Sequence, residues 1–207
     1  SRPDPDTVAT ITRVLRGEVH VLEPRKMWPG GAFGPRGKIP PGLSAEPGRI
    51  VVYADAPEWR EVLQGAFNGS PAPDAVEALR AGAVAALSRW RGSWSARPDV
   101  VVPLAAGGYP ELTSAVADHV AQVGRLERGE LTVDRTGYTD DLSSAEEAKV
   151  WRDGLHVDGA TSQAIAARTV LLLVDATSSQ WPVTVAAAKL REAGAAAVLP
   201  LVIHKRP

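Results

Sequence analysis

Two short loops, each following a run of apolar residues, contain residues that could bind a ligand. The first loop is Ala105–Tyr109, which includes Gly107 and Gly108, and the second is Asp175–Thr184. In open α/β sheets, ligands bind beyond the carboxyl ends of the strands, which is where such loops lie. Gly107 and Gly108 could bind an anion at the start of the following helix, or they could simply form a tight turn, and the pattern favours the turn.

A second set of residues suited to binding lies in a loop rich in glycine and proline near the N-terminus. Arg25, Lys26, Arg36 and Lys38 could contact DNA phosphates, and Trp28 could stack on a base or a sugar. Phosphate contact needs only positive charge in a groove, whereas stacking needs an exposed aromatic ring. The alternative is a solvated loop in which Trp28 packs against the rest of the domain.

Composition excludes several classes of site. The chain has 207 residues, no cysteine and a net charge of -1, so disulfides and thiolate metal sites are excluded. Its four histidines lack metal-ligand spacing, and we predict no metal site and no catalytic residue. No apolar run is long enough to span a bilayer and no signal peptide is visible, so we expect a soluble, cytoplasmic protein without membrane contact. The first residues include no initiator Met, which suggests a fragment of a longer protein.

Alternating apolar runs and helical patterns in the second half of the chain predict an α/β fold with a doubly wound parallel sheet. The expected strands and helices are Asp99–Leu104, Pro110 to about Val123, Thr169–Val174, Val183–Ala193 and Ala196–Ile203. An insertion, Leu126–Arg168, separates the two strand–helix units. It contains a capping box from Ser143 to Glu146 that starts a helix through Trp151, and we expect it to cover a binding site as a hood.

The first half of the chain predicts a smaller α+β segment. The expected elements are a helix at Thr7–Arg16 capped by Asp6, strands at Val19–Leu22 and Ile50–Tyr53, and helices at Glu58–Phe67 and Asp74–Arg91, the last capped by Asp74. A Ser-Pro-Ala-Pro stretch at 70–73 looks like a linker. We therefore divide the chain into a small α+β segment at 1–69, with the basic loop, and an α/β domain at 70–207.

The second loop and its flanking elements resemble the phosphoribosyl pyrophosphate motif of type I phosphoribosyltransferases. The resemblance rests on Val170–Asp175, the loop after it and Thr184–Ala195, and the hood is similar to that of the competence-type (ComF-like) branch. It implies a phosphate cradled by backbone N–H groups at a helix N-terminus, with acids on the ribose hydroxyls and magnesium. If that site is retained, its residues are Asp175, Ser178, Ser179, Thr184, Gly107 and Gly108.

The sequence departs from this motif at the positions that carry its chemistry. The family's second acid is Ala176 here, and the loop Thr177–Pro182 has no glycine to let a phosphate approach closely. The first loop also lacks a basic residue. We therefore predict a degenerate site without transferase activity, in which Trp181 fills the vacated phosphate pocket. Asp175 could still hold a ribose or a magnesium ion, or it could cap a nearby loop.

The N-terminal half is similar to the region upstream of such a domain in bacterial RecQ-like ATP-dependent DNA helicases. The resemblance rests on Leu15–Pro29, Gly37–Pro40 and Glu46–Arg49. It implies an accessory C-terminal module in DNA repair, which engages DNA or docks a partner and follows a helicase core in the same polypeptide. No Gly-x4-Gly-Lys-[Ser/Thr] loop occurs in this piece. The alternatives are a phosphoribosyltransferase or nucleotide sensor that binds phosphoribosyl pyrophosphate with magnesium, and a protein-interaction or dimerisation module.

Overall fold

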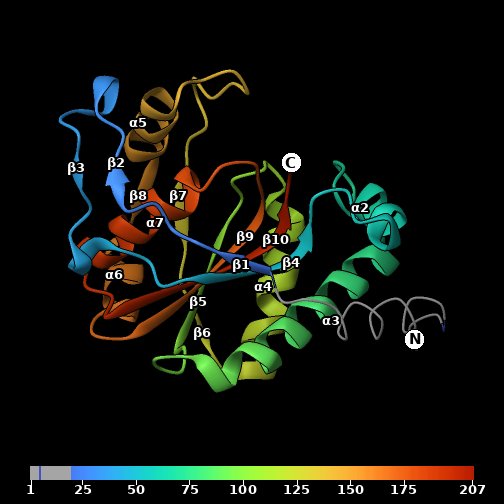
Figure 1. Cartoon of the computed structure of the whole chain (residues 1–207). Coiled ribbons are helices and arrows are strands. Elements are labelled where there is room, and N and C mark those ends of the chain that lie inside the picture. Colours follow the sequence, from blue (N-terminus) through green and yellow to red (C-terminus); the bar gives the residue numbers. More distant parts are fainter. Residues whose placement is uncertain (1–4, 6–19) are drawn as a thin grey trace.

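The computed structural model describes Pro5 and residues 20–207 (Figure 1). The helix expected at Thr7–Arg16, with its cap at Asp6, lies outside the described residues. Among the described residues, no helix is both long enough and apolar enough to cross a membrane.

A six-stranded mixed sheet forms the centre of the fold, in the order β1-β4-β10-β9-β5-β6. Its strands are β1 (His20–Leu22), β4 (Gly48–Tyr53), β10 (Ala197–Lys205), β9 (Thr169–Thr177), β5 (Val100–Leu104) and β6 (Glu127–Arg128). All neighbouring pairs are parallel except β1 with β4. The predicted α/β class is confirmed, but the sheet is not wholly parallel, because the chain doubles back at the edge to place β1 antiparallel.

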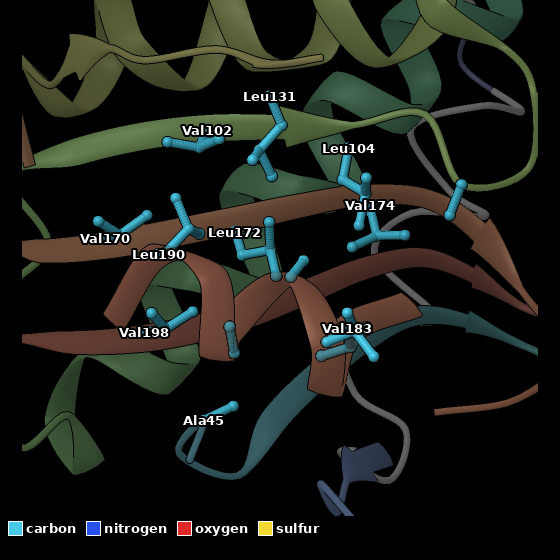
Figure 2. Close-up of a cluster of buried hydrophobic side chains, with 14 of the residues drawn as sticks. Ala45, Val102, Leu104, Leu131, Val170, Leu172, Val174, Val183, Leu190 and Val198 are labelled. Atoms are coloured by element: carbon cyan, nitrogen blue, oxygen red, sulfur yellow. The ribbon is translucent and has the colours of Figure 1, made fainter. Parts of the chain in front are cut away.

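Helices cover both faces of the sheet (Figure 1). One face carries α2 (Arg60–Ala66), α3 (Pro73–Trp90) and α4 (Pro110–Gly124), and the other carries α5 (Ser144–Gly154), α6 (Gly159–Ile165) and α7 (Trp181–Glu192). Alternate residues of each central strand supply the two cores, so Val170, Leu172 and Val174 meet α7 while Leu171 and Leu173 meet α3 and α4. Figure 2 shows the first of these cores.

The N-terminal segment joins the same sheet rather than standing apart from it. β1 and β4 extend the sheet beyond β10, and a Cβ on Gly48 would lie 2.6 Å from the carbonyl oxygen of Pro200, so glycine permits this close pairing. Between them, β2 (Met27–Trp28) and β3 (Gly37–Lys38) form a separate two-stranded hairpin. The described residues also form short 3-10 turns at Gly31–Phe33, Pro41–Leu43, Pro57–Trp59 and Arg91–Ser93. The division into 1–69 and 70–207 stays a prediction.

The insertion before β9 is a packed part of the fold. It contains β7 (Leu131–Val133) and β8 (Leu155–Val157), paired antiparallel, with α5 between them. The predicted capping box is confirmed: the Ser143 hydroxyl accepts from the Glu146 N–H, and the Glu146 carboxylate accepts from the Ser143 N–H. Helix α5 packs against α7 and against the 3-10 turn of the β2–β3 hairpin.

Two predicted details are wrong, and each has a local reason. Asp74 does not cap α3, because the helix begins one residue earlier at Pro73, with Ala72 in the cap position. Strand β9 does not end before Asp175 but continues to Thr177, since β10 pairs with it as far as Lys205. Asp175 is therefore a strand residue whose backbone is held in the sheet.

Candidate functional site

At the carboxyl ends of the neighbouring strands β5 and β9, the chain leaves toward opposite faces of the sheet. From β5 the chain passes to α4 on one face of the sheet, and from β9 it passes to α7 on the other. In α/β sheets the position between two such loops, here 105–109 and 178–180, is the usual ligand-binding crevice, and it is called the crevice below. The two loops picked out in the sequence therefore do meet at one place.

Asp175 spans this crevice and is fully buried. Its Oδ1 accepts hydrogen bonds from the backbone N–H of Gly107 at 2.8 Å and of Ala176 at 2.7 Å, and its Oδ2 accepts one from Tyr109 at 2.9 Å. Burial raises the pKa of the Asp175 carboxyl, while these three N–H groups act in the opposite direction. Asp175 thus ties the loop after β5 to β9, as the capping alternative expects.

The predicted hydroxyls of Ser178, Ser179 and Thr184 differ in whether they contact the protein or solvent. Ser179 donates to Glu147 Oε1 at 2.7 Å and accepts from the Trp181 N–H at 3.2 Å. Thr184 is buried and its Oγ1 accepts from the Arg25 N–H at 3.3 Å. Ser178 is exposed. Of the three predicted hydroxyls, only that of Ser178 lies open at the mouth of the crevice.

Trp181 occupies the first position of α7, where the resemblance would place a phosphate. Its side chain is 3% exposed and belongs to the core against β9 and β10, with the Arg25 guanidinium 5.3 Å above the ring. Its indole Nε1 is buried with no hydrogen-bond partner among the described residues. The ring therefore belongs to the core beneath the start of α7, and whether it fills a former phosphate pocket stays a prediction.

The basic residues of the N-terminal loop lie on and beside the β2–β3 hairpin. Arg25, Lys26, Arg36 and Lys38 are all exposed. Met27 pairs with Lys38 across the hairpin, and Met27 is 43% exposed, so this face of the hairpin is open to solvent. No ion pair involving these four basic side chains occurs in the described part of the chain.

Trp28 takes the opposite face of the hairpin. It is half-buried, stacks on Phe33 with ring centroids 4.8 Å apart, and packs against the core. The Arg152 guanidinium of α5 donates to the Phe33 carbonyl and lies 4.5 Å from the ring centroid. The packed alternative for Trp28 therefore fits the geometry, and its ring anchors the hairpin to α5 rather than facing a base.

Two arginines at the crevice were missed by the sequence analysis. Arg206 follows β10 directly, and its guanidinium lies 5.9 Å from the Tyr109 ring centroid. Arg135 reaches from the insertion to Gly108, where a Cβ would overlap its guanidinium. Arg206 could have been noted as a cation directly after a predicted strand, but no pattern in the sequence places Arg135 beside Gly108.

His204 lies near this edge and makes folding sensitive to pH. Its Nε2 is 2.9 Å from the Ala54 carbonyl oxygen, and burial is the main cause that lowers its pKa below the ordinary 6.5. The unfolded chain therefore takes up this proton more readily than the native one. We expect the free energy of unfolding to fall as the pH drops below about 6.5 and through the lower native pKa, with no change from this group above that range.

Urea unfolding of the wild type and of His204→Gln checks this expectation at a pH above 7 and at a pH near 5. The difference in stability between the two proteins should be larger at the higher pH, where the neutral imidazole is favourable. An equal difference at both pH values would contradict it.

Neither the protein-family models nor the curated proteins searched give a match to this chain. Among the residues that the structure describes, no group of three or more His, Asp or Glu side chains is placed to hold a metal ion.

Proposed function

We propose that this chain is the accessory C-terminal module of a RecQ-like DNA helicase, and that it engages DNA through the β2–β3 hairpin. In this proposal the α/β fold is of the type I phosphoribosyltransferase kind but serves as a scaffold without transferase activity. The helicase core would precede it in the same polypeptide and act in DNA repair. The absence of transferase activity is supported by the three backbone N–H groups that Asp175 accepts from, and DNA engagement by the exposed, unpaired cations of the hairpin.

Loss of transferase chemistry follows from what occupies the crevice. A ribose or magnesium ion would need free carboxylate oxygens, and both oxygens of Asp175 already accept hydrogen bonds inside the protein. Breaking them would leave buried N–H groups unsatisfied, at a cost of about 1–3 kcal/mol each. Ala176 offers no replacement carboxylate, and the Trp181 ring at the start of α7 is buried in the core.

DNA engagement is supported by the charge and exposure of the hairpin. Its basic side chains have no acidic partner among the described residues, so their charge is available to a polyanion. The hairpin is also held rigidly, because Phe33 is fixed by Trp28 on one side and by Arg152 on the other. A rigid, exposed cationic hairpin is suited to phosphate contact without base readout.

DNA binding should weaken when the hairpin loses charge. We expect Arg36→Gln combined with Lys38→Gln to lower DNA affinity roughly tenfold to hundredfold near physiological salt, and to reduce the slope of log K against log salt by about 2. Fluorescence anisotropy of single-stranded and duplex oligonucleotides at several salt concentrations measures both quantities. The matched control is Arg91→Gln with Arg125→Gln, which removes two exposed charges at the opposite edge of the sheet. Equal losses in both double variants, or no DNA binding by the wild type, would count against the proposal.

The competing function, a phosphoribosyltransferase or nucleotide sensor, is favoured by one feature, the exposed Ser178 hydroxyl beside the start of α7. Titration calorimetry with phosphoribosyl pyrophosphate and magnesium tests it directly. Because both carboxylate oxygens of Asp175 already accept hydrogen bonds from the backbone, we expect no binding heat up to millimolar ligand. Saturable binding that is weakened by Ser178→Ala would replace our proposal with the competing one.

A further inference from the structure

The last turns of α3 and α4 border a cavity of about 240 Å³ on one face of the sheet. The two helices lie side by side (Figure 1), and the Arg80 Nε joins them one turn earlier by donating to the Ala115 carbonyl oxygen at 3.2 Å. Pro98, directly before β5, also lines the cavity, so it lies at the edge of the sheet opposite the crevice. Most of the wall is apolar and is formed by Val84, Leu87, Val120, Val123, Leu126 and Leu171.

The volume and the aromatic wall of the cavity indicate the size and kind of group that fits it. An apolar cavity of roughly 150 Å³ binds benzene, so this larger one accommodates a group of two fused rings. Trp94 lines the cavity, and its ring meets that of Trp90 edge to face with centroids 5.9 Å apart. Because Trp90 in turn lies 5.1 Å from the Arg49 guanidinium, the aromatic wall is fixed before a ligand arrives. A flat aromatic group packs well against such a wall.

Two arginines give the cavity a positive charge. Arg91 follows the last residue of α3, and Arg97 donates to the Gly124 carbonyl oxygen at the end of α4 at 3.0 Å. A helix C-terminus carries about half a negative charge, so the two helix ends together offset about one of the two positive charges. No acidic side chain among the described residues lines the cavity. About one unit of positive charge therefore remains, which a single carboxylate balances.

The acids that follow lining residues directly in the chain have other partners. The Asp99 carboxylate accepts a hydrogen bond from the Thr169 N–H at 3.1 Å, and Glu127 pairs with Arg168 at 2.9 Å. In the described part of the chain, the two arginines of the cavity form no ion pair. Their charge is thus available to a ligand.

The surface around the cavity favours a small ligand over a protein partner. Among the described residues, the exposed large hydrophobic side chains are Val21, Met27, Tyr53 and Val123, and of these only Val123 lines the cavity. A stable protein interface covers about 800 Å² on each partner. The described residues offer no apolar patch of that kind continuing from the mouth of the cavity.

We infer that this cavity binds a small aromatic carboxylate, with a group of two rings against Trp94 and the carboxylate at Arg91 and Arg97. The inference goes beyond the proposed function and does not depend on it, because the site lies at the other edge of the sheet from the crevice and shares no residue with the hairpin.

Titration calorimetry with 2-naphthoate tests this inference, with 2-naphthamide and 2-naphthylmethylammonium as probes that keep the rings and change the charge. We expect 2-naphthoate to bind with a Kd of about 1 mM or tighter, and the neutral amide to bind roughly tenfold more weakly. The ammonium probe should bind more weakly still. Arg91→Gln combined with Arg97→Gln should abolish the preference for the anion, whereas the hairpin pair Arg36→Gln and Lys38→Gln, which also removes two charges, should retain it.

Two further measurements locate the bound probe. Val123 is 56% exposed, so Val123→Trp should block the mouth and abolish binding while thermal unfolding stays unchanged. In the wild type, amide chemical-shift changes on addition of 2-naphthoate should cluster around Leu87, Val120 and Leu126, and this readout needs no variant. The inference would be overturned by absence of wild-type binding at millimolar 2-naphthoate, by equal affinity for all three probes, or by shift changes confined to another part of the chain.

Discussion

Replacement of Asp175 by Ala is expected to lower the free energy of unfolding by about 3–6 kcal/mol, because the N–H groups that it accepts from lose their partner. The backbone N–H groups of Gly107, Tyr109 and Ala176 all donate to this one carboxylate, which has no exposed surface. The loop after β5 would also lose the tie that holds it to β9, so the start of α4 should loosen with it.

Urea unfolding followed by far-UV circular dichroism measures this loss. Asp99→Ala is the matched control, because the exposed Asp99 accepts a single N–H, from Thr169 at 3.1 Å, at the opposite end of the same two strands. The control should lose no more than about 1.5 kcal/mol. A loss at Asp175 as small as the control's would mean that its carboxylate is free, and the ribose-binding alternative would then return.

Replacement of Trp151 by Ala is expected to lower the free energy of unfolding by about 3–5 kcal/mol. Its side chain is fully buried in the core that α5 shares with α7. The Tyr138 ring lies 5.3 Å from it, and the indole N–H donates to Glu147 Oε1 at 3.3 Å. Because an alanine leaves a cavity under α5, the insertion should lose its attachment to the sheet and the hairpin should lose its support.

Lys149→Ala on the exposed side of the same helix is the control, with an expected change of no more than about 0.5 kcal/mol. Hydrogen exchange should protect the α5 amides nearly as strongly as those of β9, since both belong to one cooperative core. If Trp151→Ala loses little stability and α5 exchanges freely in the wild type, the insertion is a mobile hood over the crevice, as its sequence suggests, rather than part of the core.

The sequence alone identified most of the elements, because their signals are local. Apolar runs predicted β5, β9 and β10 to within a few residues, and the capping box set the start of α5. The same patterns placed both loops at the carboxyl edge of one sheet. Such features depend on side-chain periodicity and on hydrogen bonds within a few residues, which are visible without knowledge of the fold.

The sequence could not settle the role of Asp175. A carboxylate after an apolar run is suited equally to a ligand or to a cap, and its choice depends on which backbone lies opposite. The structure places the Gly107 N–H there, 68 residues away along the chain. The role of Trp28 was open for the same reason, because the ring of Phe33 and the helix α5 decide which way it faces.

The convergence of Arg135 and Arg206 was decided by tertiary structure alone. Neither residue belongs to a motif, and each approaches the Gly108–Tyr109 turn from a different element. Local periodicity determines that strands and helices form and which face of each is apolar. It does not determine the order of strands in the sheet, and that order, set by packing across both faces, brings these two charges to one edge.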